Sequence, residues 1–170
     1  MKLFASIALL VSAVAANPIA RAAGNVTGAF HLKTVGASEA KHNDLYVYAY
    51  HTAAGFNDAV LTSDTKTANP AFLNNTHAQF ALDTPFPWGF TMHPHNNYAA
   101  WEPVEINTGY GDEGFTIDGN GLQWSNSLFG GWLVCDWYHN EPQLFYLYKP
   151  YEAKFPSSCS RVNLQIEEIS

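Results

Sequence analysis

The chain has 170 residues and carries 15 acidic against 8 basic side chains, which gives a net charge of −7. A chain of this length can bury the core of one domain. Because DNA, RNA and anionic lipid heads all carry negative phosphate groups, the acidic balance disfavours nucleic acid and membrane surfaces as partners. No run of eighteen apolar residues is present, so we expect no transmembrane helix.

The N-terminus has the pattern of a secretory signal peptide. A lysine near the start is followed by a short apolar stretch and then by small residues, which predicts a signal peptide over residues 1–16 with cleavage after Ala15 or Ala16. Residues 17–28 are expected to form a flexible segment and residues 29–170 a single domain. The pattern therefore predicts a secreted, extracellular protein, which we expect to be a monomer.

The remaining sequence is typical of an all-β domain. Short apolar or alternating runs are separated by Gly, Asn, Asp and Pro, and no run of ten or more residues keeps a helical period. We predict a single-domain β-sandwich or β-barrel of about eight to ten short, mostly antiparallel strands, with a β-trefoil-like barrel as the alternative. No convincing internal repeat is visible. The predicted strands lie around residues 29–34, 45–51, 59–61, 79–82, 101–108, 115–117, 122–124, 132–138, 144–148 and 162–167.

Two of these segments carry sharper predictions. In residues 45–51 (LYVYAYH) the tyrosines alternate with Leu45, Val47 and Ala49, so the two sets should lie on opposite faces of one strand. Residues 118–121 (DGNG) lie between two short strand patterns and predict a tight hairpin, because Gly and Asn adopt positive φ at low cost.

Cys135 and Cys159 are the two cysteines of the chain. In a chain exported to an oxidising compartment they predict one disulfide. Asn25 and Asn74 begin Asn-X-Thr sequences, and we expect both to be glycosylation acceptors.

The aromatic residues of the segment from Trp132 to Tyr138 could either pack in the core or bind a ligand. On a strand, Leu133, Cys135 and Trp137 share one face, while Trp132 and Tyr138 lie on the other face. The aromatic residues could be core packing, or they could be a flat surface on which sugar rings stack, with Asp136, Asn140 and Gln143 as hydrogen-bonding edges. The candidate ligand-binding residues are Trp88, Trp101, Trp132, Asp136, Trp137 and Tyr138.

No local motif indicates catalysis. Serine nucleophile elbows, phosphate-binding loops, dinucleotide-binding fingerprints and zinc-protease motifs are absent. Glu102 and Glu105 lie three apart, so on a strand they point to opposite faces and cannot form a glycosidase pair with each other. His93 and His95 could bind a metal, but a third ligand is missing nearby. We therefore expect no catalytic residue, no metal and no other cofactor.

Most of the chain resembles a group of small secreted proteins from filamentous ascomycete fungi. The similar stretches include DLYVYAYHTAAGFNDA, NYAAWEPVEINTGYG, GGWLVCDWYHNEPQLFY and PSSCS. The resemblance spans about residues 30–164, implies secretion, the disulfide and one domain, and supplies no catalytic residue.

Together these observations favour a secreted, non-catalytic fungal protein that acts in the extracellular space or the cell wall. The expected partner is a cell-wall or host glycan, or a host extracellular protein, as for an effector or elicitor. The alternative is a carbohydrate-active hydrolase whose acids are brought together only by the fold. Two carboxyls within about 10 Å of each other in a cleft lined by Trp88, Trp101 or Trp132 would favour the hydrolase. A convex or flat exposed aromatic patch without paired acids would favour binding.

Overall fold

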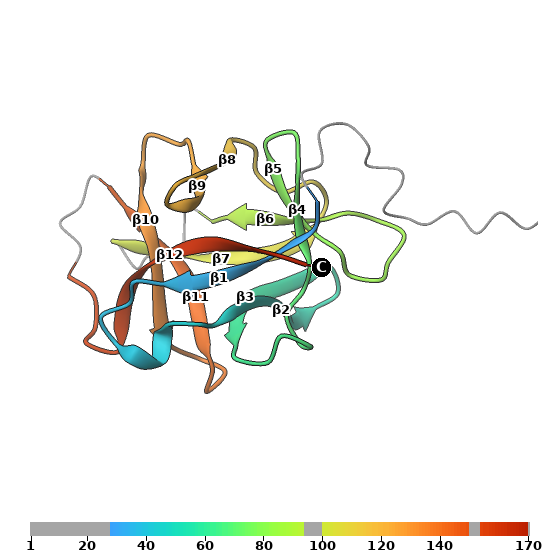
Figure 1. Ribbon diagram of the computed structural model, residues 1–170. Coiled ribbons are helices and arrows are strands. Elements are labelled where there is room, and N and C mark those ends of the chain that lie inside the picture. Colours follow the sequence, from blue (N-terminus) through green and yellow to red (C-terminus); the bar gives the residue numbers. More distant parts are fainter. Residues whose placement is uncertain (1–27, 94–99, 150–153, 170) are drawn as a thin grey trace, which may run out of the picture.

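The computed structural model describes residues 28–93, 100–149 and 154–169 (Figure 1). In this part of the chain the protein is nearly all-β, and its antiparallel strands close into a barrel. The prediction of an all-β barrel with one disulfide is therefore confirmed. The proposed signal peptide and Asn25 lie outside the described residues.

Twelve strands and one short 3₁₀ helix make up the described chain. The elements are β1 (Phe30–Val35), η2 (Ala40–His42), β2 (Tyr46–Ala53), β3 (Phe56–Thr62), β4 (Ala71–Asn74), β5 (His77–Phe80), β6 (Trp88–Met92), β7 (Trp101–Thr108), β8 (Phe115–Asp118), β9 (Gly121–Trp124), β10 (Phe129–Asp136), β11 (Pro142–Tyr148) and β12 (Cys159–Glu168). The DGNG hairpin is confirmed, since β8 and β9 pair around it.

The strand pairings repeat every four strands. The hairpins β2–β3, β6–β7 and β10–β11 are antiparallel pairs, and they also pair with one another through β3–β7, β7–β11 and β11–β3. Between the hairpins, β1 pairs with β12 and β4, β4 with β5, and β8 with β9. Three successive four-strand units thus surround a pseudo-threefold axis. This is the arrangement of a β-trefoil, so the structure contains a repeat that the sequence does not show.

The β8–β9 hairpin completes one side of the barrel through close backbone contacts. The amide of Phe115 donates to the carbonyl of Thr76, just before β5, at 2.8 Å. Gly121, at the start of β9, has φ +93°, and a Cβ built there would lie 2.0 Å from the carbonyl oxygen of Leu164 in β12. Glycine is therefore required at this position both for its conformation and for its lack of a side chain.

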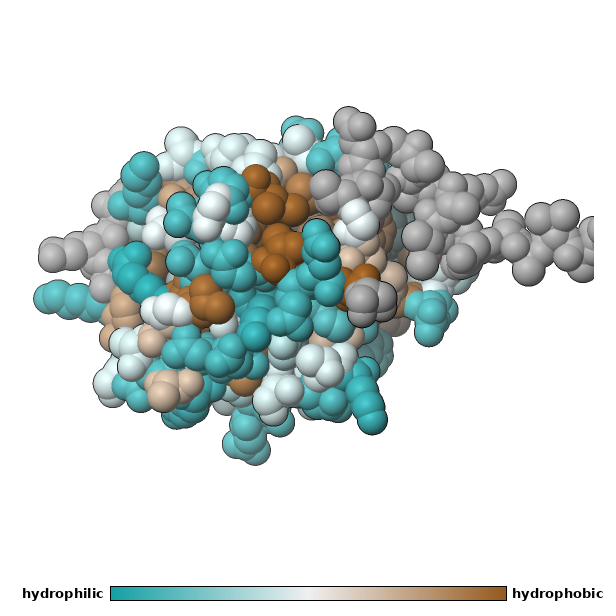
Figure 2. All heavy atoms as spheres, in the orientation of Figure 1, coloured by the Kyte–Doolittle hydropathy of each residue, from teal (hydrophilic) through white to brown (hydrophobic). Residues whose placement is uncertain are grey.

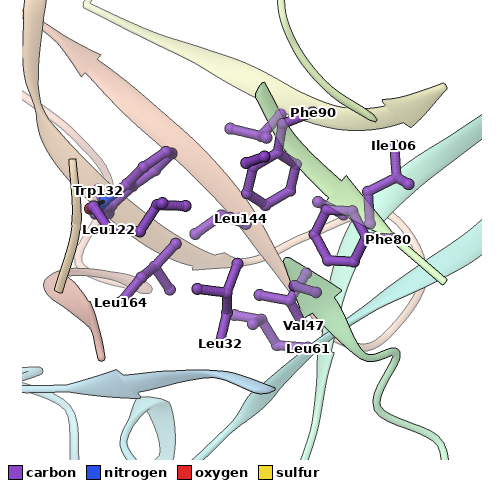
Figure 3. Close-up of a cluster of buried hydrophobic side chains, with 14 of the residues drawn as sticks. Leu32, Val47, Leu61, Phe80, Phe90, Ile106, Leu122, Trp132, Leu144 and Leu164 are labelled. Carbon is purple, nitrogen blue, oxygen red and sulfur yellow. Dashed lines mark hydrogen bonds between the residues drawn. The ribbon is translucent and has the colours of Figure 1, made fainter. Parts of the chain in front are cut away.

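The main core lies inside the barrel (Figure 3). Leu32, Leu61, Phe90 and Leu164 come from four different strands, and their side chains point toward one another. Val104 and Ile106 of β7 and Val162 and Leu164 of β12 are found there, and so is Val47 from the alternating tyrosine strand. Burial of one such side chain stabilises the fold by about 1.5–3 kcal/mol.

β10 is covered on both faces. Trp132 and Val134 belong to the main core, whereas Leu133 and Cys135 belong to a second buried cluster with Phe145. The predicted division of these residues between two faces is therefore confirmed. Cys135 lies opposite Cys159 in the β10–β12 ladder, and the disulfide joins the two strands.

The face drawn in Figure 2 is mainly hydrophilic, and hydrophobic residues gather near its centre. Within the described residues, no helix is long and apolar enough to cross a membrane.

Candidate functional site: a pocket where three hairpins meet

A shallow pocket of about 230 Å³ lies where the three hairpins pair with one another. The ladders place Asp58 of β3 opposite Glu105 of β7, Pro103 of β7 opposite Phe145 of β11, and Gln143 of β11 opposite Val60 of β3. Five of these residues line the pocket, together with two aromatic residues that follow β10. The lining residues are Asp58, Pro103, Glu105, Trp137, Tyr138, Gln143 and Phe145.

Two carboxylates form the acidic side of the pocket. Asp58 and Glu105 are direct partners in an antiparallel ladder, so their side chains lie on the same face with Cβ atoms about 4.5–5.5 Å apart. A histidine ring nitrogen lies close to each carboxylate. Nε2 of His139 lies 2.6 Å from Oδ2 of Asp58, and Nε2 of His93 lies 2.8 Å from Oε2 of Glu105. Asn107 also donates from Nδ2 to Oε2 of Glu105 at 2.6 Å.

Aromatic rings also line the pocket. Trp137 is partly buried and meets Phe145 edge to face, with ring centroids 5.3 Å apart. Tyr138 is 84% exposed, the largest exposed fraction among the large hydrophobic residues of the described chain. Its ring lies 5.0 Å from that of His139, which in turn stacks on Tyr50 at 4.0 Å. The rings of Trp137 and Tyr138 therefore offer an aromatic surface beside the two acids.

Gln143 adds a third polar group. The residue is only 4% exposed, and its side-chain oxygen Oε1 has no hydrogen-bond partner among the described residues. A buried acceptor without a partner destabilises the fold by about 1–3 kcal/mol. Native proteins keep such groups rarely and often for a functional reason. Gln143 therefore places a buried amide with an unpaired oxygen in the wall of the pocket.

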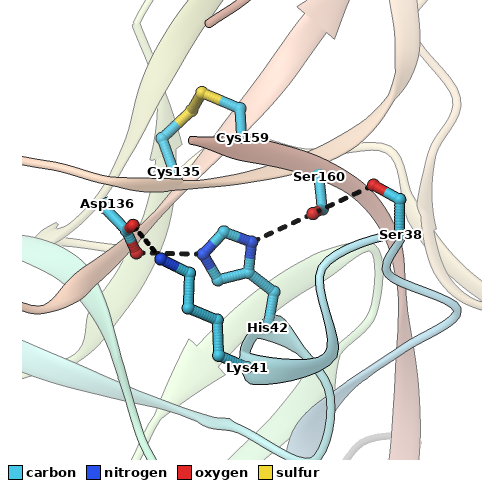
Figure 4. Close-up of a disulfide and its surroundings, with 7 residues drawn as sticks. All are labelled: Ser38, Lys41, His42, Cys135, Asp136, Cys159 and Ser160. Carbon is cyan, nitrogen blue, oxygen red and sulfur yellow. Dashed lines mark hydrogen bonds and ion pairs between the residues drawn. A yellow bond between two sulfur atoms is a disulfide. The ribbon is translucent and has the colours of Figure 1, made fainter. Parts of the chain in front are cut away.

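Asp136 does not line this pocket. It forms an ion pair with Lys41, and its Oδ1 lies 3.0 Å from Nε2 of His42 (Figure 4). Lys41 first, and His42 second, lower the pKa of this carboxyl. The other ring nitrogen of His42 lies 3.0 Å from Oγ of Ser160. This network attaches η2 to β10 and β12 beside the disulfide.

The network has the residue types of a Ser-His-Asp triad, but its serine cannot act as a nucleophile. Ser160 is fully buried and its Oγ already accepts the amide of Glu39 at 3.1 Å. A substrate carbonyl has no access to that oxygen, whereas a catalytic serine must reach the scissile group. The network is therefore structural.

The remaining tryptophan candidates do not line the pocket. Trp132 is 2% exposed, and its indole donates to the carbonyl of Leu122 at 2.6 Å. Trp88 is 7% exposed, and its indole donates to Oγ1 of Thr84. Trp101 packs partly buried against the second cluster. Thus only Trp137 and Tyr138 among the six predicted contact residues line the pocket.

A profile of known families matches residues 27–168 and describes them as a domain of unknown function, DUF7907. The chain belongs to the DUF7907 family. No curated protein and no solved structure shows a significant match to it. The DUF7907 domain spans all twelve described strands and thus the whole pocket.

The predicted glycosylation acceptor Asn74 and the candidate metal ligand His93 both lie in the described part of the DUF7907 domain. Asn74 ends β4 beside an exposed turn, and its Nδ2 donates to Oε1 of Gln79 at 3.2 Å. His93 pairs with Glu105, and His95 lies outside the described residues. Within the described ranges, no group of three or more His, Cys, Asp or Glu side chains is placed to hold a metal ion.

The sequence predicts part of the site of the DUF7907 domain. Trp137 and Tyr138 belong to the aromatic segment, and Gln143 is one of its predicted hydrogen-bonding edges. Asp58 and Glu105 are not predicted as a pair, because they come from strands far apart along the chain. Two acids on separate predicted strands are a weak signal, since many β proteins contain them.

Proposed function

We propose that this protein is a secreted, non-catalytic carbohydrate-binding protein, which acts in the extracellular space or cell wall of a filamentous fungus. The observation that supports this function most directly is the pocket itself, which combines aromatic rings with carboxylate and amide oxygens. The aliphatic faces of sugar rings stack on aromatic side chains, while their hydroxyl groups donate to such oxygens.

Export is supported by two features of the chain. The N-terminal sequence has the pattern of a signal peptide, and the two cysteines are joined in a disulfide, which persists in oxidising compartments. The fungal source rests on the resemblance of the motifs to small secreted ascomycete proteins.

The size of the pocket favours binding over hydrolysis. At about 230 Å³ the pocket is smaller than the usual ligand cleft of roughly 300–1,000 Å³. A glycosidase must hold sugar rings on both sides of the bond that it cleaves. A pocket of this size suits one sugar ring or the end of a chain.

A retention assay on insoluble polysaccharides tests this function. The secreted, disulfide-intact protein would be incubated with chitin, β-glucan and plant-wall polysaccharides, and bound protein would be measured. We expect retention on at least one of them, and about tenfold weaker retention for Trp137→Ala and Tyr138→Ala, since each removes a stacking surface. Tyr110→Ala is the matched control, because Tyr110 is 61% exposed and lies outside the pocket.

Equal retention of all three folded variants would contradict the assignment of the pocket. No retention of the wild-type protein on any polysaccharide would contradict carbohydrate binding and favour a host extracellular protein as the partner.

A hydrolase is the second candidate, because Asp58 and Glu105 lie directly opposite each other. Carboxyl groups about 5–5.5 Å apart are typical of retaining glycosidases. Release of reducing sugar in the same tubes, abolished by both Asp58→Asn and Glu105→Gln, would establish the hydrolase. Retention without sugar release would establish binding alone.

A further inference from the structure

The pocket presents acceptors and no cationic side chain. Its polar lining includes the carboxylates of Asp58 and Glu105 and the side-chain amide of Gln143, and no Lys or Arg lines it. Nε2 of His139 is hydrogen-bonded to Oδ2 of Asp58, and Nε2 of His93 lies 2.8 Å from Oε2 of Glu105. Among the described residues, Oδ1 of Asp58 and Oε1 of Glu105 have no protein partner. Two carboxylate oxygens on neighbouring strands are therefore available beside one small space.

A ligand that satisfies these oxygens must bring several hydrogen-bond donors. A sugar hydroxyl has one O–H donor together with two acceptor lone pairs, whereas a primary ammonium has three donors and no acceptor. Opposite charge adds to the attraction, because hydrogen bonds between ionised groups are about twice as strong as neutral ones. The arrangement of oxygens thus matches an ammonium better than a hydroxyl.

The aromatic residues that line the pocket favour the same kind of ligand. A cation over the face of Trp or Tyr is attracted by the ring quadrupole, and Trp137 and Tyr138 both line the pocket. The whole chain carries a net charge of −7, which raises the local concentration of cations and disfavours anionic ligands.

We propose that the pocket recognises an amino sugar with a free, protonated amine, such as the glucosamine units of deacetylated chitin. The ammonium lies between the carboxylates of Asp58 and Glu105, and the sugar ring stacks on Trp137 or Tyr138. This inference rests on the proposed carbohydrate-binding function and specifies the chemical class of its ligand.

The test compares two tetrasaccharides that differ only in acetylation. Binding of the β-1,4-linked glucosamine tetramer and of its fully N-acetylated form would be measured by calorimetry in 0.15 M salt, because at that salt concentration long-range attraction between exposed charges is largely screened. We expect the free-amine tetramer to bind at least about tenfold more tightly, as expected for a hydrogen bond to a charged group. Asp58→Asn and Glu105→Gln keep the shape of the side chains and should each abolish most of that preference.

Glu113→Gln provides the matched control, since it changes the net charge equally at an exposed position outside the pocket. The preference for the free-amine tetramer could be unchanged in both pocket variants, or it could be lost equally in Glu113→Gln. Either result would overturn the assignment of the amine to this pocket. Thermal unfolding of each variant would show that it is folded.

The outcomes separate the two proposals. Equal binding of both tetramers would overturn the amino-sugar inference and leave carbohydrate binding intact. Binding of neither tetramer, together with no retention on polysaccharides, would overturn the proposed function itself. Tighter binding of a short lysine peptide than of the glucosamine tetramer would overturn the sugar as ligand and favour a basic protein segment.

Discussion

His42 shows how a single residue can look catalytic and be structural. Its side chain is fully buried, and its two ring nitrogens contact Asp136 and Ser160. A buried imidazole is tolerated because both nitrogens have partners. Asp136 is also bonded to Lys41, and this carboxylate therefore contributes to the folded structure and not to the pocket.

Stability in acid should depend on Asp136. Its pKa is lowered, chiefly by Lys41 and then by His42, so its stabilising contribution is present above the ordinary Asp pKa of about 4 and is lost as the pH falls through the lower folded value. In the wild-type protein the free energy of unfolding should decrease when the pH is lowered below about 4. Asp136→Asn should be less stable at pH 7 and show a shallower fall, measured by denaturant unfolding between pH 7 and pH 2.

Glu167 also has a lowered pKa, through hydrogen bonds from Tyr46 and Lys33, so some acid sensitivity should remain in the Asp136→Asn variant. Asp118→Asn in the exposed β8–β9 turn is the control. Parallel curves for wild type and Asp136→Asn would contradict the role of the carboxylate.

Truncation of two aromatic residues in the same segment should change the free energy of unfolding by very different amounts. Trp132 is 2% exposed and Tyr138 84% exposed. Trp132→Ala leaves a cavity in the main core and should lower the free energy of unfolding by about 3–5 kcal/mol, while Tyr138→Ala should change it by less than about 0.5 kcal/mol. Urea unfolding would measure both values, and similar losses for the two variants would contradict the described burial.

At the scale of elements, one glycine determines how the β8–β9 hairpin closes the barrel. Gly121→Ala would place a methyl group against the backbone of β12 and should cost several kcal/mol, more than the roughly 1–3 kcal/mol usual for overpacking, because backbone cannot move aside as a flexible side chain can. Gly119 lies in the same hairpin with nothing within 4 Å of its Cβ position. Gly119→Ala should therefore be tolerated, and equal melting temperatures for the two variants would contradict this contact.

Most strands could be predicted from the sequence because apolar and polar residues alternate along them. Val104 and Ile106 mark β7, and Val162 and Leu164 mark β12, and all four are buried. β6 is not predicted because its residues are buried at nearly every position, so apolar and polar residues do not alternate, and two prolines precede it. β4 is as short as β5, β8 and β9, and it is not predicted because its first three residues are all apolar and show no alternation.

The site was harder to predict because it is made by pairing between strands. Asp58 and Glu105 meet only because β3 and β7 belong to hairpins that pair around the pseudo-threefold axis. Tyr138 shares a predicted face with Trp132, yet β10 ends at Asp136, and the alternation rule does not extend to the residues beyond it. The sequence could therefore indicate aromatic residues of interest but not which of them are exposed.

At the scale of the whole molecule, the three hairpins place the pocket at the axis of the barrel. Each junction between hairpins contributes to its lining, and the aromatic residues come from the segment that leaves β10. The rest of the core stabilises this arrangement, so ligand binding is expected to change local contacts at one end of the barrel and to leave the fold unchanged.

The most direct test of the proposed pocket is an NMR titration of the ¹⁵N-labelled protein with the glucosamine tetramer. The five tryptophans provide side-chain N–H signals that report separately on the core and the pocket. We expect the signals of Trp137, Gln143, Asp58 and Glu105 to shift progressively with ligand, while the indole signal of Trp132 stays in place. Shifts confined to other surfaces, or no shifts at millimolar ligand, would contradict a carbohydrate site where the three hairpins meet.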